Sequence, residues 1–272
     1  MELRDAYFST LHEKMKSDPS MFVIVGDFSA HWLERIATDF PQQYLNAGIA
    51  EANIISMAAG MAIQGRRVYV VGQCNFVTLR CIEQISIDLC MMKLPVTIVG
   101  CSPGYTMSID GPTHHGITDL GMMMQLPCEI YNCSDEWITK YVAMHKATIP
   151  TYVRLPKGEH PNYGRPYSID QGFSVLRGGE HWTVSSGIMV HEAMKGGNAV
   201  IDLYRPHPLN GIGLIDAIGE SFVDVLEDNL FGPIHKAIAG AFALLDDPRS
   251  IAPQSYTFEY GTREFVQKKA GL

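Results

Sequence analysis

Residues 67–100 read RVYVVGQCNFVTLRCIEQISIDLCMMKLPVTIVG, and this stretch decides the fold. RVYVVG (67–72) and PVTIVG (95–100) are short apolar runs rich in β-branched residues, which is typical of buried strands. Residues 76–92 between them carry apolar side chains at helical spacing. A strand, a helix and a second strand of this kind predict two parallel strands joined by a crossover helix.

The same alternation extends along the chain in both directions. On the N-terminal side we expect a strand over 22–26 and helices over 31–38 and 51–64; on the C-terminal side, strands over 128–133 and 151–155 around a helix over 135–146. Later strands are expected over 182–187, 198–204 and 221–227, with helices near 213–219 and 233–245. Continuously apolar strands that alternate with helices predict an α/β fold with parallel or mixed sheets covered on both faces.

A segment rich in proline and glycine, LPKGEHPNYGRPYSIDQG (155–172), separates two such alternations. Such composition is typical of a connection between domains. We therefore expect one domain over 1–160, a linker over 161–171 and a smaller α/β domain over 172–272.

Composition excludes several classes of protein. With 46% hydrophobic and 18% charged residues, the chain of 272 residues is not expected to be disordered. The net charge of -8 and the lack of a basic block argue against nucleic-acid binding. No apolar run reaches the roughly 18 residues that a membrane span needs, and the charged first 18 residues do not resemble a signal peptide. Six cysteines without CxxC spacing predict reduced core thiols and a cytoplasmic protein.

One carboxylate is unusual in its setting. Glu51 lies in YLNAGIAEANIISMAA (44–59), an otherwise uncharged stretch, at the start of an expected helix. A first-turn glutamate can simply complement the helix dipole. The apolar neighbours favour a second interpretation, a low-dielectric site in which the neutral carboxyl is favoured and shares a proton with a ring nitrogen.

A second candidate is the loop SIDGPTHHGITDL (108–120), which presents Asp110, His114 and His115 after an expected strand. Loops at strand ends carry the chemistry of many α/β proteins. A metal site is disfavoured because adjacent histidines rarely point at one ion. A structural alternative stays open, in which Asp119 caps a helix and the histidines are exposed.

Two further residues are candidates from their positions. Arg154 ends an apolar strand, where it could bind an anion or form a salt bridge. Phe76 follows the polar run that begins at Gln73 after a strand. Such a phenylalanine is usually part of the core, but here it could stack on another ring at the edge of a site.

Taken together, these residues resemble the C-terminal half of a transketolase. The matching segments cover nearly the whole chain: NAGIAEAN (46–53), residues 76–100, DGPTHHGITDL (110–120), VIDLYRPHPLN (200–210) and VLEDNLFGPIHKAI (225–238). The resemblance implies thiamine diphosphate as cofactor, bound between a pyrimidine domain on one chain and a diphosphate domain on another. It implies a pyrimidine-binding domain followed by a transketolase C-terminal-like domain.

The resemblance also implies a partner. A diphosphate–Mg²⁺ site in this family needs a GDG turn and a later asparagine, and the nearest string here, GDF (26–28), lacks the second glycine. We therefore expect one subunit of a split enzyme, with Mg²⁺ and the diphosphate held by an N-terminal-type partner subunit. The expected assembly is α2β2, and no metal ligands are expected on this chain.

Roles toward the cofactor follow residue by residue. Glu51 corresponds to the glutamate that shares a proton with the aminopyrimidine ring, and we assign it a catalytic role. Phe76 corresponds to the aromatic residue that stacks on that ring. Gln73, at the same strand end, is expected to contact the cofactor as well.

Roles toward the substrate follow in the same way. Asp110 and His114 correspond to residues that contact sugar hydroxyls, and His114 is also expected to take part in catalysis. Arg154 corresponds to an arginine associated with substrate phosphate. Ser102 stands where the family often has a histidine, and Gln43 where split members often have an arginine, so both depart from the usual pattern. The segment 191–203 is also shorter than in the family.

The expected function is transfer of a two-carbon ketol unit from a ketose or ketose phosphate to an aldehyde, in complex with the partner. Two alternatives stay open. One is a β-type subunit of a 2-oxoacid dehydrogenase or of a synthase that condenses pyruvate with an aldehyde. The other is a non-catalytic subunit that stabilises its partner. The resemblance does not specify which sugars are used.

Overall fold

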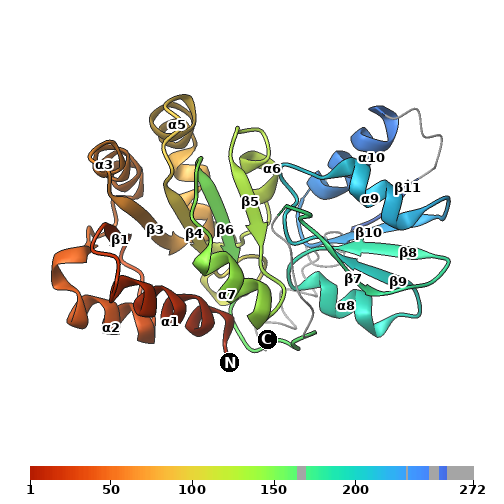
Figure 1. The fold of residues 1–272 in the computed structure, drawn as a ribbon, viewed down its shortest axis with the longest axis horizontal. Helices are drawn as coiled ribbons and strands as arrows, with labels where there is room; N and C mark the ends of the chain where they lie inside the picture. Colours follow the sequence, from red (N-terminus) through yellow and green to blue (C-terminus); the bar gives the residue numbers. More distant parts are fainter. Residues whose placement is uncertain (164–169, 231, 245–250, 256–272) are drawn as a thin grey trace.

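The computed structural model describes residues 1–163, 170–230, 232–244 and 251–255, which form two sheets with helices packed on them (Figure 1). The first sheet has the order β2-β1-β3-β4-β6-β5, and every pair of neighbouring strands is parallel. Its strands are β1 (Met21–Val25), β2 (Tyr44–Asn46), β3 (Arg67–Gln73), β4 (Thr97–Cys101), β5 (Glu129–Asn132) and β6 (Thr151–Leu155). The predicted α/β class with a parallel sheet is confirmed.

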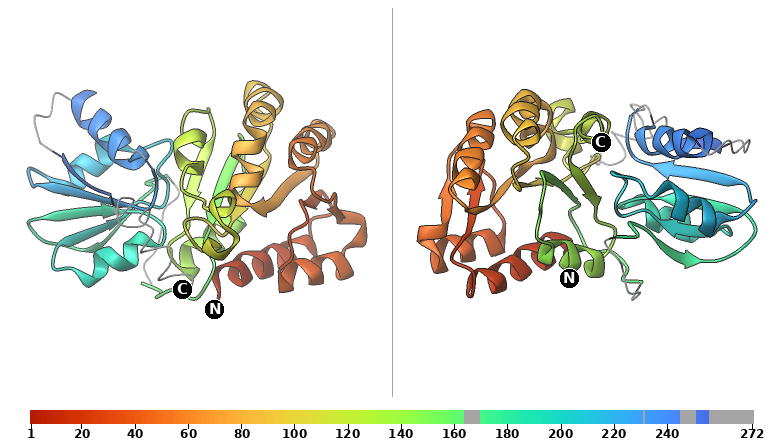
Figure 2. Two further views of the ribbon diagram at one scale, coloured as in Figure 1. Left: turned by 180° about the vertical axis from the view of Figure 1, so that it is seen from behind. Right: turned by 45° about the horizontal axis from the view of Figure 1, so that its top comes forward.

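Helices cover both faces of this sheet (Figures 1 and 2). One face carries α1 (Leu3–Met15), α2 (His31–Asp39) and α7 (Glu136–Met144); the other carries α3 (Glu51–Ile63), the helical segment 74–91 and α6 (Asp119–Met123). In β3, Val68 and Val70 belong to one buried cluster while Tyr69 and Val71 belong to the other. Burial on both faces explains why the strands are apolar at consecutive positions.

The predicted helix over 76–92 is interrupted. The segment consists of α4 (Cys74–Val77), a 3₁₀ turn (Leu79–Cys81), α5 (Ile82–Gln84) and a π-helical stretch (Ile85–Met91). At the first break, Thr78 has φ −118° and ψ −79°, and its hydroxyl donates to the carbonyl of Cys74 at 2.6 Å. A threonine bonded to the backbone four residues earlier competes with the helical pattern, which accounts for the break.

The second sheet is mixed and smaller, with the order β11-β10-β8-β9-β7. Its strands are β7 (Ser174–Arg177), β8 (Trp182–Ser185), β9 (Ala199–Asp202), β10 (Val223–Glu227) and β11 (Ile251–Ser255), and its helices are α8 (Met189–Lys195), α9 (Gly211–Ile218) and α10 (Pro233–Leu244). Among these five described strands, only β7 runs antiparallel to its neighbour. Residues 164–169 of the predicted linker lie outside the described residues. In the described part of the chain, no helix is both long and apolar enough to cross a membrane.

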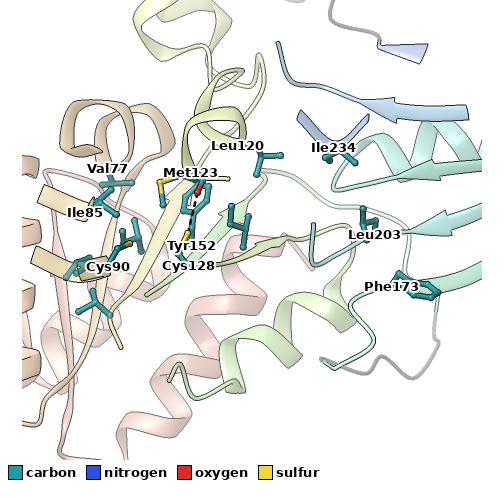
Figure 3. Packing of buried hydrophobic residues seen from close by; sticks show 14 of the residues in the cluster. Val77, Ile85, Cys90, Leu120, Met123, Cys128, Tyr152, Phe173, Leu203 and Ile234 are labelled. Carbon is teal, nitrogen blue, oxygen red and sulfur yellow. Dashed lines mark hydrogen bonds between the residues drawn. The ribbon is translucent and has the colours of Figure 1, made fainter. Parts of the chain in front are cut away.

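The two sheets are joined by main-chain bonds and a shared apolar cluster. The amide of Ile130 donates to the carbonyl of His207 at 2.7 Å, and the amide of Asn132 to that of Tyr204 at 2.9 Å. One cluster of buried side chains has members from both sheets; Figure 3 shows Tyr152 and Met123 on the side of the first sheet and Leu203 and Phe173 on the side of the second. All six cysteines are buried and free, as predicted.

A buried acid lies at this junction. Ser134 donates its hydroxyl to Asp202 Oδ2 at 2.5 Å, and no protein group bonds Oδ1 among the described residues. Burial raises the pKa of Asp202 to about 8, against the smaller lowering effect of the Ser134 hydrogen bond. The folded protein therefore holds a proton on Asp202 at neutral pH, whereas the unfolded chain with a pKa near 3.9 does not.

We expect Asp202→Asn to change how stability depends on pH. Between about pH 4 and pH 8 the folded state binds more protons at Asp202 than the unfolded state, so this group's contribution to stability falls as pH rises. The free energy of unfolding of the wild type should fall relative to the variant by about 1 kcal/mol per pH unit within that window. Urea denaturation at pH 5, 6.5 and 8 measures this, and parallel curves for the two proteins would contradict the assignment.

Candidate active site

A cavity of about 520 Å³ lies at the carboxyl ends of β1, β3 and β4. It is lined by Arg4, Gly26, Asp27, Phe28, Ser29, Ile49, Glu51, Gln73, Phe76, Arg80, Ser102, Met107, His114 and Lys157. Open α/β folds bind ligands at the carboxyl edge of the parallel sheet, because the loops that follow the strands meet there and the sheet holds them in place. Five of the predicted site residues meet at this cavity, while Asp110 and Arg154 do not line it.

Glu51 is placed by a turn between β2 and α3. Asn46 Oδ1 accepts a hydrogen bond from the backbone amide of Gly48 at 3.0 Å. Gly48 has a φ of +70°, a conformation that favours glycine. The chain then enters α3 with Glu51 as its first residue, only 3% exposed. Gly26 allows this packing, since a Cβ there would lie 3.2 Å from Glu51 Cγ. The predicted burial of the carboxyl is thus confirmed.

Glu51 has a basic partner that the uncharged sequence around it does not reveal. Arg80 donates from Nη1 to Glu51 Oε2 at 2.8 Å, although it lies 29 residues further along the chain. The side chain of Arg80 is 44% exposed, so the ion pair joins a buried carboxylate to a guanidinium at the cavity surface. The uncharged sequence around Glu51 could not indicate this pairing, because the partner comes from the broken helix after β3.

Phe76 lies between two other site residues. The guanidinium carbon of Arg80 is 4.2 Å from the centroid of its ring, within the range of a cation–π contact. The ring of His114 meets it edge to face, with centroids 5.0 Å apart and planes at 70°. One face of the Phe76 ring is therefore turned toward the cavity and covered there by a planar cation.

Polar residues at the end of β3 and just after it hold the histidine loop in place. Gln73 donates to the carbonyls of Ser102 and His114, both at 3.2 Å. Asn75 donates to the carbonyl of His115 at 2.6 Å. The polar residues that predicted the edge of a site thus form hydrogen bonds to the backbone of the loop. The side-chain amide of Gln73 is used in two of these bonds. These hydrogen bonds to the carbonyls of His114 and His115 hold the backbone of both histidines in position.

Two predicted substrate residues of this region differ in position. Ser102 is buried, lines the cavity and has φ +57°, an unusual conformation for a residue other than glycine. Asp110 lies in the same loop but is exposed and outside the cavity lining. The loop itself is closed by paired amide–carbonyl bonds of 2.8 Å between Gly104 and Gly116.

Arg154 lies away from the cavity in a buried network. It donates from Nε to Asp119 Oδ2 at 2.8 Å and from Nη1 to Asp228 Oδ1 at 2.8 Å, and Nη2 bonds the carbonyl of Gly116 at 2.7 Å. Burial alone would lower the pKa of Arg154, but the two carboxylates hold it above its usual value. Of the two alternatives for this residue, the salt bridge is present. A phosphate contact does not fit, because carboxylates and a carbonyl occupy the guanidinium.

Sequence reasoning missed three basic residues at the cavity: Arg4, Arg80 and Lys157. Arg4 is paired with Glu2 at 2.6 Å, whereas Lys157 is exposed at the rim just beyond β6. Lys157 lies in the proline- and glycine-rich segment 155–172, whose composition predicts a connection between domains and gives no sign of a site. Within the described ranges, no group of three or more His, Cys, Asp or Glu side chains is placed to hold a metal ion.

Comparison with known proteins identifies the family. Residues 1–162 match the model of the transketolase pyrimidine-binding domain. The chain belongs to this family. Glu51, Phe76 and the histidine loop all lie inside the matched region, so the cavity is part of the family's domain.

Relatives extend the family match toward the C-terminus. The chain is 27% identical over 201 residues to the 6-deoxy-6-sulfo-D-fructose transketolase subunit SqwH of Clostridium sp. (strain MSTE9), covering 71% of this chain and 62% of the relative. It is 28% identical over 260 residues to a putative transketolase C-terminal section of Methanocaldococcus jannaschii, covering 89% and 82%. A structure described as a split gene transketolase in an inactive β4 tetramer superposes with a TM-score of 0.80 at 24% identity, over 100% of this chain and 99% of that one. That superposition covers both sheets, so this chain and the split gene transketolase chain share one fold.

Proposed function

We propose that this chain is one subunit of a heteromeric, thiamine-diphosphate-dependent transferase of the transketolase type. It would transfer a two-carbon ketol unit from a ketose or ketose phosphate to an aldehyde. The observation that carries this proposal is the buried Glu51 carboxylate beside the Phe76 ring in a cavity of the pyrimidine-binding family. The similarity to transketolase subunits supports the reaction class.

The residues of the cavity fit the pyrimidine half of the cofactor. A planar cation already lies against Phe76 and bonds Glu51, so the space accepts a flat group with a hydrogen-bonding edge. In this proposal Glu51 shares a proton with a ring nitrogen and Phe76 stacks on the ring. Gln73 contributes by holding the loop that faces the ring. Bound thiamine diphosphate would supply the nucleophilic carbon that attacks the ketose.

The substrate would enter beside His114. This histidine is half-buried, lines the cavity and contacts Phe76, so it can donate or accept a proton at a sugar hydroxyl. Ser102 offers a small hydroxyl where the family often has an imidazole. The exposed Lys157 ammonium at the rim would bind an anionic end of the substrate, a role for which Arg154 is not available. Asp110 would contact the substrate only if its loop moves toward the cavity.

A partner subunit would complete the site. This sequence has no GDG turn followed by an asparagine, so the proposal assigns the diphosphate and Mg²⁺ to a diphosphate-binding subunit in an α2β2 assembly. Two large apolar side chains are exposed near the cavity, Ile49 at 75% and Ile109 at 79%, as expected of a surface that another chain covers. In this proposal the pyrimidine-binding domain spans 1–160 and the C-terminal domain 172–272. Six free thiols support a cytoplasmic location.

The choice of donor tests the reaction class. The partner is sought in the neighbouring open reading frame, and the two chains are mixed with thiamine diphosphate and Mg²⁺. We expect turnover of hydroxypyruvate or a ketose phosphate with an aldehyde acceptor, and none by either chain alone. Preference for pyruvate would favour the condensing-synthase alternative, and full activity of this chain alone would contradict the split site.

A further inference from the structure

Arg80 occupies the place that the proposed function gives to the pyrimidine ring. It makes the two contacts expected of that ring. Its guanidinium carbon lies over Phe76, 4.2 Å from the ring centroid, and its Nη1 donates a hydrogen bond to Glu51 Oε2 at 2.8 Å. Both contacts use the same planar guanidinium, and its side chain lines the cavity. A ring and this guanidinium cannot both lie on the same face of Phe76 and bond the same carboxylate oxygen.

Arg80 also occupies the carboxylate oxygen that a ring nitrogen would use. Its Nη1 donates to Glu51 Oε2 at 2.8 Å, and a ring nitrogen that bonds this buried oxygen from the same side has to take the place of that donor. Arg80 must therefore leave Glu51 before this carboxyl can act. The half-exposed position of Arg80 and the irregular 3₁₀ turn that carries it allow the side chain to swing toward solvent.

We propose that Arg80 is a stand-in for the cofactor ring in the free subunit, which covers Phe76, neutralises the buried Glu51 and must be displaced when the ring enters. The inference rests on the proposed function, since it concerns the same pocket. It gives Arg80 a role that opposes cofactor binding: the residue protects an incomplete site and lowers the apparent affinity for the cofactor. Its removal should therefore tighten binding rather than weaken it.

The test is a calorimetric titration of thiamine diphosphate, at saturating Mg²⁺, into the assembled complex. Arg80→Met keeps the apolar stem and loses the planar cation. Because an exposed ion pair and a cation–π contact are each worth up to about 1 kcal/mol, we expect the dissociation constant to fall about three- to thirtyfold. Arg80→Lys keeps the charge without the planar stacking group and should give a smaller decrease.

A matched control is available on α2. Arg35 also lies over an aromatic ring, 5.6 Å from the centroid of Trp32, and pairs with Asp39 at 3.8 Å, but it does not line the cavity. Arg35→Met should leave the dissociation constant unchanged. A second measurement uses this chain alone: 4-amino-5-hydroxymethyl-2-methylpyrimidine, the ring part of the cofactor, is titrated by NMR, and the Arg80→Met variant should bind it more tightly than wild type.

The outcomes separate this inference from the proposed function. If the wild-type complex binds thiamine diphosphate and both Arg80 variants bind it equally or more weakly, the stand-in role is wrong and the function stands. If the wild-type complex does not bind thiamine diphosphate, the proposed function fails and the inference fails with it. Tighter binding by Arg80→Met with unchanged binding by Arg35→Met supports both.

Discussion

Replacement of Glu51 by alanine is expected to lower turnover of the assembled complex by about 10²- to 10⁴-fold, the usual loss for a group that transfers a proton in catalysis. Glu51→Gln should lose nearly as much, because an amide keeps the shape and hydrogen-bonding edge but cannot exchange the proton. The steady-state rate with a ketose donor at saturating thiamine diphosphate measures both effects.

The loss should be catalytic and not structural. Glu51 lies at the first turn of α3 without a side-chain cap bond, and its ionic partner Arg80 can turn to solvent when the carboxylate is removed. Melting temperature and assembly with the partner should therefore stay close to wild type. Glu192→Gln, which alters an exposed glutamate paired with Lys195 on α8, is the matched control and should keep full activity. Near wild-type turnover of the Glu51→Ala complex would contradict the catalytic role and favour a non-catalytic subunit that stabilises its partner.

The second large effect concerns stability. Arg154→Met is expected to lower the free energy of unfolding by about 3–5 kcal/mol, because it leaves the buried carboxylates of Asp119 and Asp228 without a counter-charge. Urea denaturation at pH 7 measures the change. Asp119→Asn combined with Arg154→Met should recover part of the stability, because the amide removes one of the two unpaired buried charges.

Arg177 provides the comparison. It is partly buried and donates to backbone carbonyls, among them those of Asn198 at 2.6 Å and Gly196 at 2.8 Å, but it forms no salt bridge within the described residues. Arg177→Met removes hydrogen bonds without exposing a buried charge and should cost about 1–2 kcal/mol. Equal losses for the two arginines would contradict the view that unpaired carboxylates dominate the effect at Arg154.

The sequence was sufficient to predict the parallel sheet, because strands buried on both faces must be apolar at consecutive positions. RVYVVG and PVTIVG became β3 and β4, and the helix after Glu51 ends one residue earlier than expected. Several elements were missed, α1, β2, α6, β7 and β11, and two of them show why. The helix α1 was overlooked although Leu3, Tyr7 and Leu11 recur at helical spacing, since charged residues between them hide the pattern. The short edge strand β2 is too brief for a periodic signal.

The site was only partly predictable for a different reason. Glu51, Gln73, Phe76, Ser102 and His114 meet because they follow strands whose carboxyl ends share one edge, which topology dictates. The pairs that fix their chemistry depend on long-range packing instead. Arg80 meets Glu51 across 29 residues, and Asp228 meets Arg154 across 74. No local pattern indicates such partners.

The central claim is that this chain holds half of a cofactor site. The most direct measurement is a titration of thiamine diphosphate with Mg²⁺ into this chain alone, into the diphosphate-binding partner alone and into their mixture. The account predicts that tight, saturable binding occurs in the mixture and that Glu51→Ala in the mixture weakens it. Binding by this chain alone with the affinity of the mixture would contradict the claim.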